Sequence, residues 1–371
     1  MKVPVYDIVN CGPRHQFSAN GKVVKNSSLG LQVHNFRRDA FSPEDAEFYK
    51  RQMLLGDDLV DRDGRPVRVM DTLGKMLRSA IIPEEGNVLV VGDWNAVESR
   101  MTAYLAGQDD KIELFREGGD PYCHAASMIY GREITPEDVD ERQIGKVVDL
   151  SCGFLGGPGA LQSMATAFRL HIPVDQGKGI VDKYRRGHKE TVDFGNKLQR
   201  AALNALTRPG KTYDARGIEY TFNSDDRALY CRLLDGETVL RYPECRVEMD
   251  FAPWDEDKSQ AKIPKISALQ ASFSPGANDK EWARHGLWRG LFLENVAQAS
   301  CAKILRDAGV NCEEEGLDVI FHVHDELVLE VPEAEADAAC RTLRDIMNET
   351  PSWAPGLPLK AEPVIMARYG K

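Results

Sequence analysis

The sequence predicts an α+β fold, in which helices accompany an antiparallel sheet. Residues 87–93 (NVLVVGD) form a short apolar run of the kind that makes a buried strand. Residues 317–332 (LDVIFHVHDELVLEVP) have the pattern of a strand, a tight turn and a second strand. Much of the remaining chain carries apolar residues at helical spacing, so helices are expected around these strands.

The first part of the chain is predicted to change from short strands to helices. Residues 3–26 are apolar pieces separated by NCGPRHQ and NG, which indicate small strands and turns. Residues 43–81 are mostly helical by pattern, with a turn at DRDGRP. After the strand at 87–93, a helix over about 96–105 is expected to end at Gly107, because glycine commonly follows a helix.

The rest of the chain mixes helical and strand-rich segments. Thr135 and Pro136 are a suitable helix start, because threonine can cap and proline fits the first turn; this helix extends to about Phe154 and stops at GGPG. The remaining predicted segments are two helical pieces over 160–206, strands and turns over 211–250, an exposed loop over 251–280, a helix over about 282–307 and a last helix over about 333–349.

Length and composition are those of a soluble globular protein with two to three domains, since the chain has 371 residues, 42% hydrophobic and 28% charged. No apolar run approaches the roughly 20 residues of a membrane span, and a signal-peptide pattern is absent, so a cytoplasmic location is expected. The eight cysteines form no C-x-x-C pair. Reduced thiols are therefore expected, without a disulfide scaffold or a zinc site.

The net charge of −11 weighs against a nucleic-acid-binding protein, because phosphate contacts need lysine and arginine. Net charge is a sum over the whole chain, however, and a concave basic site can coexist with an acidic exterior. The acidity therefore lowers the expectation of DNA or RNA binding without excluding it.

Two predicted turns, 232 residues apart, carry carboxylates at the ends of apolar strands. Asp93 ends the first strand, with Glu98 and Arg100 shortly after it, and Asp325 and Glu326 lie at the turn of the hairpin. Each feature has an ordinary explanation, because aspartate favours turns and can cap a helix. If the two strands are neighbours, however, the carboxylates converge. Such hard oxygen ligands suit a pair of Mg²⁺ ions that clamp an in-line phosphoryl displacement.

A third segment places two cations and two apolar side chains on one helix face. Arg142, Lys146, Leu150 and Phe154 are spaced by four residues, so they share a slowly drifting face. On this face, Arg142 and Lys146 suit the phosphates of a triphosphate, and Leu150 and Phe154 suit contact with a base or sugar. The alternative is a helix with a solvated, charged start and a buried end.

In order along the chain, these segments resemble the three motifs of the family A DNA polymerases. DWNAVESR (93–100) resembles motif A, RQIGKVVDLSCGF (142–154) resembles motif B, and VHDE (323–326) resembles motif C. The flanking stretches LQVHNFRR and ENVAQASCAKIL resemble further conserved stretches of that family, and the ending GLPLKAEPVIMARYGK is similar to its phage branch. The resemblance covers about residues 28–371. It implies a palm, which is an antiparallel sheet with helices, plus helical fingers.

The resemblance implies a template-directed DNA polymerase in which a primer 3′-hydroxyl attacks the α-phosphorus of a deoxynucleotide, with two Mg²⁺ ions neutralising the developing charge. The metal ligands would be Asp93, Asp325 and the backbone carbonyl of Trp94, with Glu326 as a nearby secondary acid. The other implied site residues are Arg142, Lys146 and Tyr122 at the nucleotide phosphates, Leu150, Phe154 and Glu98 around the sugar or template, and Asn35, Arg100, Gln298 and His324 toward the DNA.

Three positions depart from the family pattern. Leu150 stands where the family usually has Phe or Tyr, so discrimination at the sugar 3′-hydroxyl can differ here. Trp94 and Phe154 each replace a tyrosine, and no metal ligand is lost. The domains implied by the resemblance are palm over 27–118, fingers with an insertion over 119–280, and palm again over 281–371.

Residues 1–26 resemble the C-terminal fragment of an intein. A strand-like VYDI, a His-x-Phe pair and an NG dipeptide precede a terminal asparagine and a serine, which is the order in those elements. The resemblance implies that Ser27 accepts an acyl group, that Asn26 cyclises and cuts the chain before Ser27, and that His15 polarises the carbonyl or moves protons. Lys25 stands where a histidine is usual. The alternative is a plain N-terminal hairpin.

Such a fragment needs a partner, because 26 residues cannot bury a core unaided. We therefore expect a split intein, with a separate chain that carries the polymerase N-terminal half and the larger intein piece. Without that half, this chain is expected to be a feeble polymerase, acting in the cytoplasm of a bacterial host if it is a phage enzyme. The alternatives are an incomplete reading frame from a contiguous intein-bearing gene, and a non-catalytic nucleic-acid-binding or assembly subunit that retains a polymerase fold.

Overall fold

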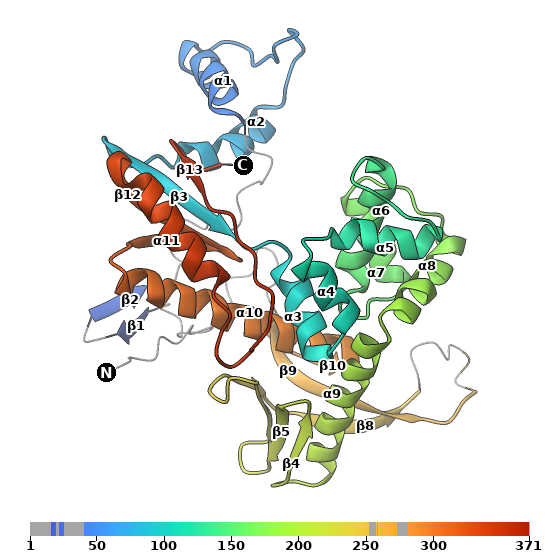
Figure 1. The fold of residues 1–371 in the computed structure, drawn as a ribbon. Helices are drawn as coiled ribbons and strands as arrows, with labels where there is room; N and C mark the ends of the chain where they lie inside the picture. Colours follow the sequence, from blue (N-terminus) through green and yellow to red (C-terminus); the bar gives the residue numbers. More distant parts are fainter. Residues whose placement is uncertain are drawn as a thin grey trace. The chain divides into compact units, whose positions relative to one another are not determined.

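The computed structural model describes residues 16–19, 22–25, 41–251, 257, 259–272 and 281–370, which form two compact units (Figure 1). The first unit comprises residues up to 95, 304–349 and 360 onward; the second comprises 96–303 and 350–359. Each unit combines helices with antiparallel sheet, so the predicted α+β class is confirmed. The division into palm and fingers stays a prediction.

The first unit contains a four-stranded antiparallel sheet in the order β11-β12-β3-β13. Its strands are β3 (Asn87–Asp93), β11 (Val319–Val323), β12 (Glu326–Pro332) and β13 (Val364–Met366). β3 pairs with β12 along its whole length, so that Glu326 lies opposite Asp93 and Pro332 lies opposite Asn87. The two apolar segments recognised in the sequence are therefore neighbours, as the convergence of their carboxylates requires.

The two faces of this sheet differ in what covers them. One face carries an apolar cluster made of Leu89, Val91, Val323, Val328 and Tyr369. Because side chains alternate along a strand, Asp93 lies on this face, in line with Leu89 and Val91. On the opposite face, helix α11 (Ala336–Asn348) comes so close to Gly92 that an added Cβ would lie 2.4 Å from Met347 Sδ. The glycine thus lets the helix pack directly against the strand that ends at Asp93.

Besides residues 304–314, which are the end of a longer helix, the first unit contains short helices and a hairpin. They are α1 (Pro43–Leu55), α2 (Val69–Met76), the 3-10 helices η3 (Arg78–Ala80) and η4 (Glu333–Glu335), and the strands β1 (Gln16–Ala19) and β2 (Lys22–Lys25). The Ser42 hydroxyl caps α1 by accepting a hydrogen bond from the Asp45 N–H at 3.1 Å. These elements agree with the helices predicted over 43–81 and with the small strands predicted before residue 26.

The second unit begins with a group of helices. They are α3 (Val97–Ala106), α4 (Asp109–Arg116), α5 (Pro121–Tyr130), α6 (Val139–Cys152), α7 (Pro158–Ala167), α8 (Val174–Gly187) and α9 (Lys189–Thr207). Helices α5 to α8 share a buried apolar core. Gly145 of α6 lies against α5, where an added Cβ would be 2.1 Å from the Tyr122 carbonyl oxygen. Because glycine has no side chain, α6 and α5 can approach each other this closely.

Two antiparallel sheets follow the helices of the second unit. One has the order β4-β5-β6-β7, and the other has the order β10-β9-β8. Their strands are β4 (Thr212–Ala215), β5 (Ile218–Asn223), β6 (Ala228–Arg232), β7 (Val239–Tyr242), β8 (Arg246–Asp250), β9 (Ile263–Ser272) and β10 (Glu281–Leu287). The five strands up to β8 agree with the strand-rich segment predicted over 211–250.

Two predictions in this region were wrong. The predicted loop over 251–280 contains β9, because hydrogen bonds to β8 on one side and β10 on the other make it a central strand despite its proline and charges. The helix predicted from 282 begins only at Arg289, as α10 (Arg289–Glu314), since the preceding residues pair with β9.

Helix boundaries also differ from the prediction around α6. The Thr135 N–H donates to Asp138 Oδ2 at 2.9 Å, so Thr135 and Pro136 lie in a turn and the helix starts at Val139. The helix ends at Cys152, which leaves Phe154 just beyond it. Residues 160–206 form three helical pieces rather than two. Within the described residues, a search for membrane-crossing helices finds none.

Candidate active site

The carboxylates of the first unit meet at one end of the β3–β12 pair. Glu326 lies directly opposite Asp93, and Asp325 precedes Glu326 in the turn from β11. The Trp94 N–H donates to the backbone carbonyl oxygen of Asp325 at 3.3 Å. Asp93, Trp94 and Asp325, three of the predicted metal-site residues, are therefore consecutive or hydrogen-bonded neighbours.

The turn that carries Asp325 has an uncommon backbone. Val323 pairs with Glu326, so only His324 and Asp325 connect β11 to β12. His324 is exposed and has a φ of 55°, in the left-handed region that non-glycine residues rarely occupy. Such conformations concentrate at functional sites, where the surrounding structure enforces them. Here the strand ladders on both sides of β12 enforce a tight turn that presents Asp325 at its tip.

Glu326 is held differently from the two aspartates. Its side chain is buried, and its Oε1 accepts a hydrogen bond from the Tyr369 hydroxyl. Arg78 in turn donates to the Tyr369 hydroxyl at 3.3 Å, with its guanidinium 5.2 Å from the ring centre. The carboxylate thereby connects β12 to Tyr369 beside the two aspartates, and its role as a secondary acid stays a prediction.

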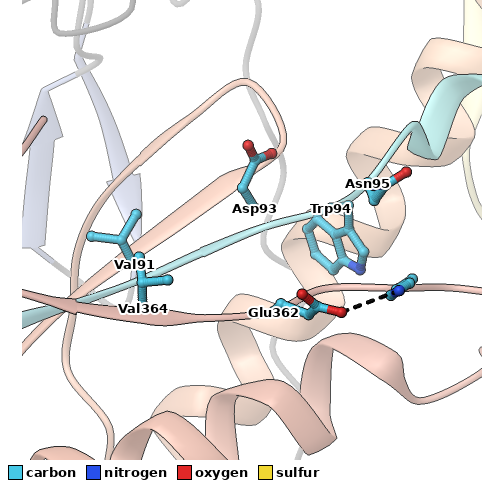
Figure 2. Close-up of a pocket in the computed structure, with 7 residues that line it drawn as sticks. Val91, Asp93, Trp94, Asn95, Glu362 and Val364 are labelled. Carbon is cyan, nitrogen blue, oxygen red and sulfur yellow. Dashed lines mark ion pairs between the residues drawn. The ribbon is translucent and has the colours of Figure 1, made fainter. Parts of the chain in front are cut away.

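A pocket of about 250 Å³ lies beside Asp93 (Figure 2). Its lining consists of Val91, Asp93, Trp94, Asn95, Lys360, Glu362 and Val364. Lys360 and Glu362 form an ion pair at 3.1 Å on the segment before β13. Figure 2 shows Asp93 and Val91 pointing to one side of β3 and Trp94 to the other. The Trp94 indole N–H donates to the Met347 carbonyl oxygen at 2.7 Å, which anchors the strand end to α11.

The donor set at this strand end fits magnesium better than a softer metal. Among the described residues, no group of three or more His, Cys, Asp or Glu side chains is arranged to hold a metal ion. Protein Mg²⁺ sites commonly use one or two carboxylates, with waters and substrate phosphates completing the octahedron. Asp93, Asp325 and a backbone carbonyl meet that smaller requirement, so the residues fit a metal bound together with a nucleotide.

In the second unit, the two cations of α6 lie around one aromatic ring. Arg142 and Lys146 approach the Tyr122 ring centre at 5.4 Å and 5.6 Å. Asp120, which caps α5, lies 2.7 Å from both Nε and Nη2 of Arg142. The predicted grouping of Arg142, Lys146 and Tyr122 is therefore present. Nothing in the sequence pattern indicated that Asp120 already pairs with Arg142.

Glu98 and Gln298, predicted separately near the sugar and the DNA, lie together. Burial raises the pKa of Glu98, a hydrogen bond from the Gln298 side chain opposes this effect, and Glu294 raises the pKa further. A carboxyl group that is hydrogen-bonded to an amide can also form a hydrogen bond with a sugar hydroxyl. Glu98 thus keeps a polar partner although its surroundings disfavour its charge.

Arg100 is placed differently from its predicted role at the DNA. The residue is buried, its guanidinium lies 4.3 Å from the Phe115 ring centre, and its Nη1 donates to the Pro358 carbonyl oxygen at 2.9 Å. Burial lowers the pKa of Arg100 to about 10, so it stays charged at neutral pH. These contacts favour a structural role in the second unit over a DNA contact.

A second, small cavity lies behind the apolar end of α6. Its volume is about 50 Å³, and its lining includes Glu98, Leu150 and Phe154. The same cavity is lined by a buried polar cluster that the sequence interpretation missed: Lys111, Asp149, Tyr184 and His188. The available signal was weak, namely a single acid, Asp149, within the apolar run VVDL of a helix.

His188 is a buried histidine at the edge of this cluster. Its Nδ1 lies 2.9 Å from the Tyr184 carbonyl oxygen and therefore donates to it, while its Nε2 has no partner among the described residues. Burial, assisted by the charge of Lys111, lowers the pKa of His188 to about 4. The hydrogen bond to the Tyr184 carbonyl and the charge of Asp149 raise the pKa without restoring it, and His124 lowers it further.

The buried His188 predicts an acid-sensitive fold. Because the folded-state pKa lies below the ordinary 6.5, the unfolded chain binds more protons between about pH 6.5 and 4. Stability is therefore expected to fall by about 3 kcal/mol as the pH drops through this window. The check is denaturant unfolding at several pH values for the wild type and for His188→Asn, which keeps a donor and removes the titration. His188→Asn should flatten the slope, the exposed His171→Asn should not, and equal slopes in all three would contradict the assignment.

Four predicted site residues lie outside the described residues: His15, Asn26, Ser27 and Asn35. Their roles stay predictions. The hairpin of β1 and β2 is described, with Ala19 paired to Lys22 and Gln16 paired to Lys25. Two of the small strands expected in this segment are therefore present, whereas the NG dipeptide between them lies outside the described residues.

Comparisons with known proteins agree on one class of enzyme. Residues 66–219 match the family model of DNA polymerase family A. The chain is 28% identical over 303 residues to the DNA polymerase of Bacillus phage SP02, which covers 81% of this chain and 44% of that protein. It is 25% identical over 301 residues to the thermostable DNA polymerase I of Thermus thermophilus, covering 80% of this chain and 28% of that protein.

A solved structure shows the same fold. It is the POL domain of Pol1 from M. smegmatis in complex with DNA primer-template and dNTP, with a TM-score of 0.50, 18% sequence identity, and coverage of 82% of this chain and 43% of that chain. The chain spans less than half the length of the curated relatives it matches. The matched region 66–219 contains Asp93 and helix α6, whereas Asp325 lies beyond it.

Proposed function

We propose that this chain is the catalytic part of a nucleotidyltransferase that uses two divalent metal ions. Within that class, we propose the C-terminal half of a phage-type family A DNA polymerase, which extends a primer 3′ end as a DNA template directs. The observation that carries the proposal is the pairing of β3 with β12, in which Asp93 lies opposite Glu326 and beside the turn with Asp325. The match of residues 66–219 to the family model supports it.

In this proposal, Asp93, Asp325 and the Trp94 carbonyl would hold two Mg²⁺ ions, which would supply charge neutralisation at the α-phosphorus. The primer 3′-oxygen forms a bond to the α-phosphorus, the bond to the β-phosphate oxygen breaks, and pyrophosphate leaves as the hydroxyl proton passes to solvent. The role of the chain is to fix the acids: the β3–β12 ladder fixes Asp93, and the two-residue turn fixes Asp325. Glu326, held by Tyr369, keeps that turn in place.

The incoming deoxynucleotide is proposed to bind along α6. Arg142 and Lys146 would bind its phosphates beside Tyr122. Arg142 would then either keep its ion pair with Asp120 while it binds a phosphate, or release Asp120. The apolar residues Leu150 and Phe154, with Glu98, would contact the sugar or template. Toward the DNA, the proposed contacts are Gln298, His324 and Asn35; Arg100 is left out because it is buried.

The proposed parts of this enzyme are a palm over 27–118 and 281–371 and fingers over 119–280. Its partners would be primer–template DNA, dNTPs and a chain or segment with the N-terminal half of the polymerase. The curated relatives, more than twice as long as the matched part, support a further segment of this kind. A phage polymerase of this type would act in the cytoplasm of the host cell.

We further propose that residues 1–26 take part in protein splicing with an intein piece outside this chain. The support is the ordered pattern of His15, Asn26 and Ser27, and a hairpin of β1 and β2 just before the cleavage position. Splicing would join Ser27 to the N-terminal half through a normal peptide bond.

Primer extension tests the polymerase proposal. The chain, joined to its N-terminal half, is given primer–template DNA of four template sequences, Mg²⁺ and single dNTPs. We expect incorporation of the complementary nucleotide in each case, and feeble extension by the 371-residue chain alone. DNA binding without any incorporation by the joined protein would instead support the non-catalytic subunit. Strong extension by the unjoined chain would contradict its dependence on the N-terminal half.

A further inference from the structure

We infer that the buried cluster of Lys111, Asp149, Tyr184 and Ser99 is a positioning device that fixes the rotation of α6 and thereby sets selectivity for the nucleotide sugar. The inference rests on the proposed function, because it assigns the outer face of α6 to the nucleotide. The four residues come from four helices of the second unit, namely α4, α6, α8 and α3.

The Asp149 carboxylate is the centre of the cluster. Its Oδ1 lies 2.7 Å from Lys111 Nζ and accepts a hydrogen bond from the Tyr184 hydroxyl at 2.7 Å. Its Oδ2 accepts a hydrogen bond from the Ser99 hydroxyl at 3.2 Å. The side chains of Lys111 and Asp149 are only 6% and 4% exposed. Burial alone would raise the pKa of Asp149, but Lys111 and Tyr184 hold it below its ordinary value, so the carboxyl group is ionised.

A buried pair of this kind is not needed for stability alone. Desolvation of the two charges offsets much of their attraction, so well-packed apolar residues often serve a fold equally well. Charge-assisted hydrogen bonds from three directions do, however, fix the carboxylate in one orientation. Since Asp149 lies on α6, that geometry defines how α6 is rotated about its axis.

The rotation of α6 matters because Leu150 is the next residue after Asp149. Successive helix residues are about 100° apart, so Asp149 pointing inward places Leu150 toward the outer face, where it is 42% exposed. The small cavity is lined by Asp149 and Lys111 at its inner end and by Leu150, Phe154 and Glu98 as well. Leu150, Phe154 and Glu98, which are proposed at the sugar, therefore line the same cavity as the cluster that orients α6.

Two unpartnered atoms extend the polar part of this wall. Among the described residues, Thr102 Oγ1 and His188 Nε2 are buried without hydrogen-bond partners, and both residues line the same cavity. These two atoms add to the polar part of a cavity wall to which Ala103, Leu150 and Phe154 contribute apolar surface. A charge change at Asp149 would therefore be felt at Leu150 and Phe154, which line the same cavity, and at Tyr184, which belongs to the apolar core of α5 to α8.

The test uses the joined polymerase with Asp149→Asn, which keeps the shape and removes the charge. We expect KM for dNTPs to rise about 10- to 100-fold. The preference for dNTPs over dideoxynucleotides and ribonucleotides should change as well. The affinity for primer–template should stay the same. Asp193→Asn is the matched control, because Asp193 pairs with Lys197 at 2.7 Å on the exposed face of α9. This control should behave like the wild type.

A second variant covers the case in which Asp149→Asn fails to fold. The double variant Lys111→Met with Asp149→Leu removes both charges and leaves none unpaired, so it should fold and still show the altered KM and sugar preference. A lower melting temperature with normal KM and sugar preference, in either variant, would reduce the cluster to a structural ion pair and overturn the inference.

Hydrogen exchange separates this inference from the proposed function. In the 371-residue chain, Asp149→Asn should speed amide exchange within Val139–Cys152, whereas Asp193→Asn should not. Unchanged exchange in this helix would overturn the positioning role whether or not the enzyme is active. A joined wild type that incorporates no nucleotide, with the exchange result as expected, would overturn the proposed function alone.

Discussion

Replacing Asp93 by asparagine is expected to lower the rate of nucleotide incorporation by about 10³-fold or more. The substitution keeps the size of the side chain and its place opposite Glu326, and removes one of the two carboxylates proposed to bind metal. Metal ions supply several kcal/mol of charge stabilisation in such reactions, and each 1.4 kcal/mol corresponds to a factor of about ten. The measurement is single-turnover incorporation by the joined polymerase at saturating DNA and dNTP.

The control for this experiment lies on the same hairpin. Asp318 immediately precedes β11, at the end of that strand away from Asp325, and is exposed. Asp318→Asn should keep the wild-type rate, and Asp325→Asn should match the loss of Asp93→Asn. Affinity for primer–template and the melting temperature are measured for each variant. An Asp93→Asn enzyme that folds, binds DNA and incorporates nucleotides within tenfold of the wild type would remove the metal-binding assignment.

The convergence of Asp93 and Asp325 could be predicted only on the condition that their two apolar strands are neighbours, and the resemblance to motifs A and C pointed the same way. The register between β12 and β3 could not be predicted from the sequence. It depends on the pairing of β12 with β3 and on the approach of α11 to Gly92, both of which involve partners far away in the chain. Motif spacing thus located the carboxylates, while tertiary packing decided which of them faces which.

The charged residues were harder to predict than the strands. Spacing by four placed Arg142 and Lys146 on one face of α6, and both lie against Tyr122. Spacing says nothing about a partner on another helix, so Asp120 was missed. Arg100 follows Asp93 by seven residues, as the motif requires, yet its guanidinium is buried against Phe115. A motif fixes positions along the chain, whereas burial depends on elements such as α4 that lie outside the motif.

Replacing Asn26 by alanine is expected to abolish release of the N-terminal segment and formation of the joined polymerase. In the proposed chemistry, the side-chain nitrogen of Asn26 attacks its own backbone carbonyl, the bond to Ser27 breaks, and Ser27 leaves with a free amine. Alanine has no such nitrogen, so this step has no substitute. The chain is mixed with the proposed partner chain that carries the remaining intein piece, and the products are followed by electrophoresis and mass spectrometry.

The order of steps makes the Asn26 result specific. Ser27 acts before Asn26, so Asn26→Ala should accumulate a branched ester between the two chains, whereas Ser27→Ala should show neither ester nor joined product. Asn10→Ala, an asparagine change within the same segment, should splice like the wild type. His15→Ala should slow the release of the 26-residue fragment without stopping ester formation, because a proton carrier near neutral pH serves the cyclisation. Wild-type chains that never join, or an Asn26→Ala chain that joins normally, would show that residues 1–26 are an ordinary hairpin.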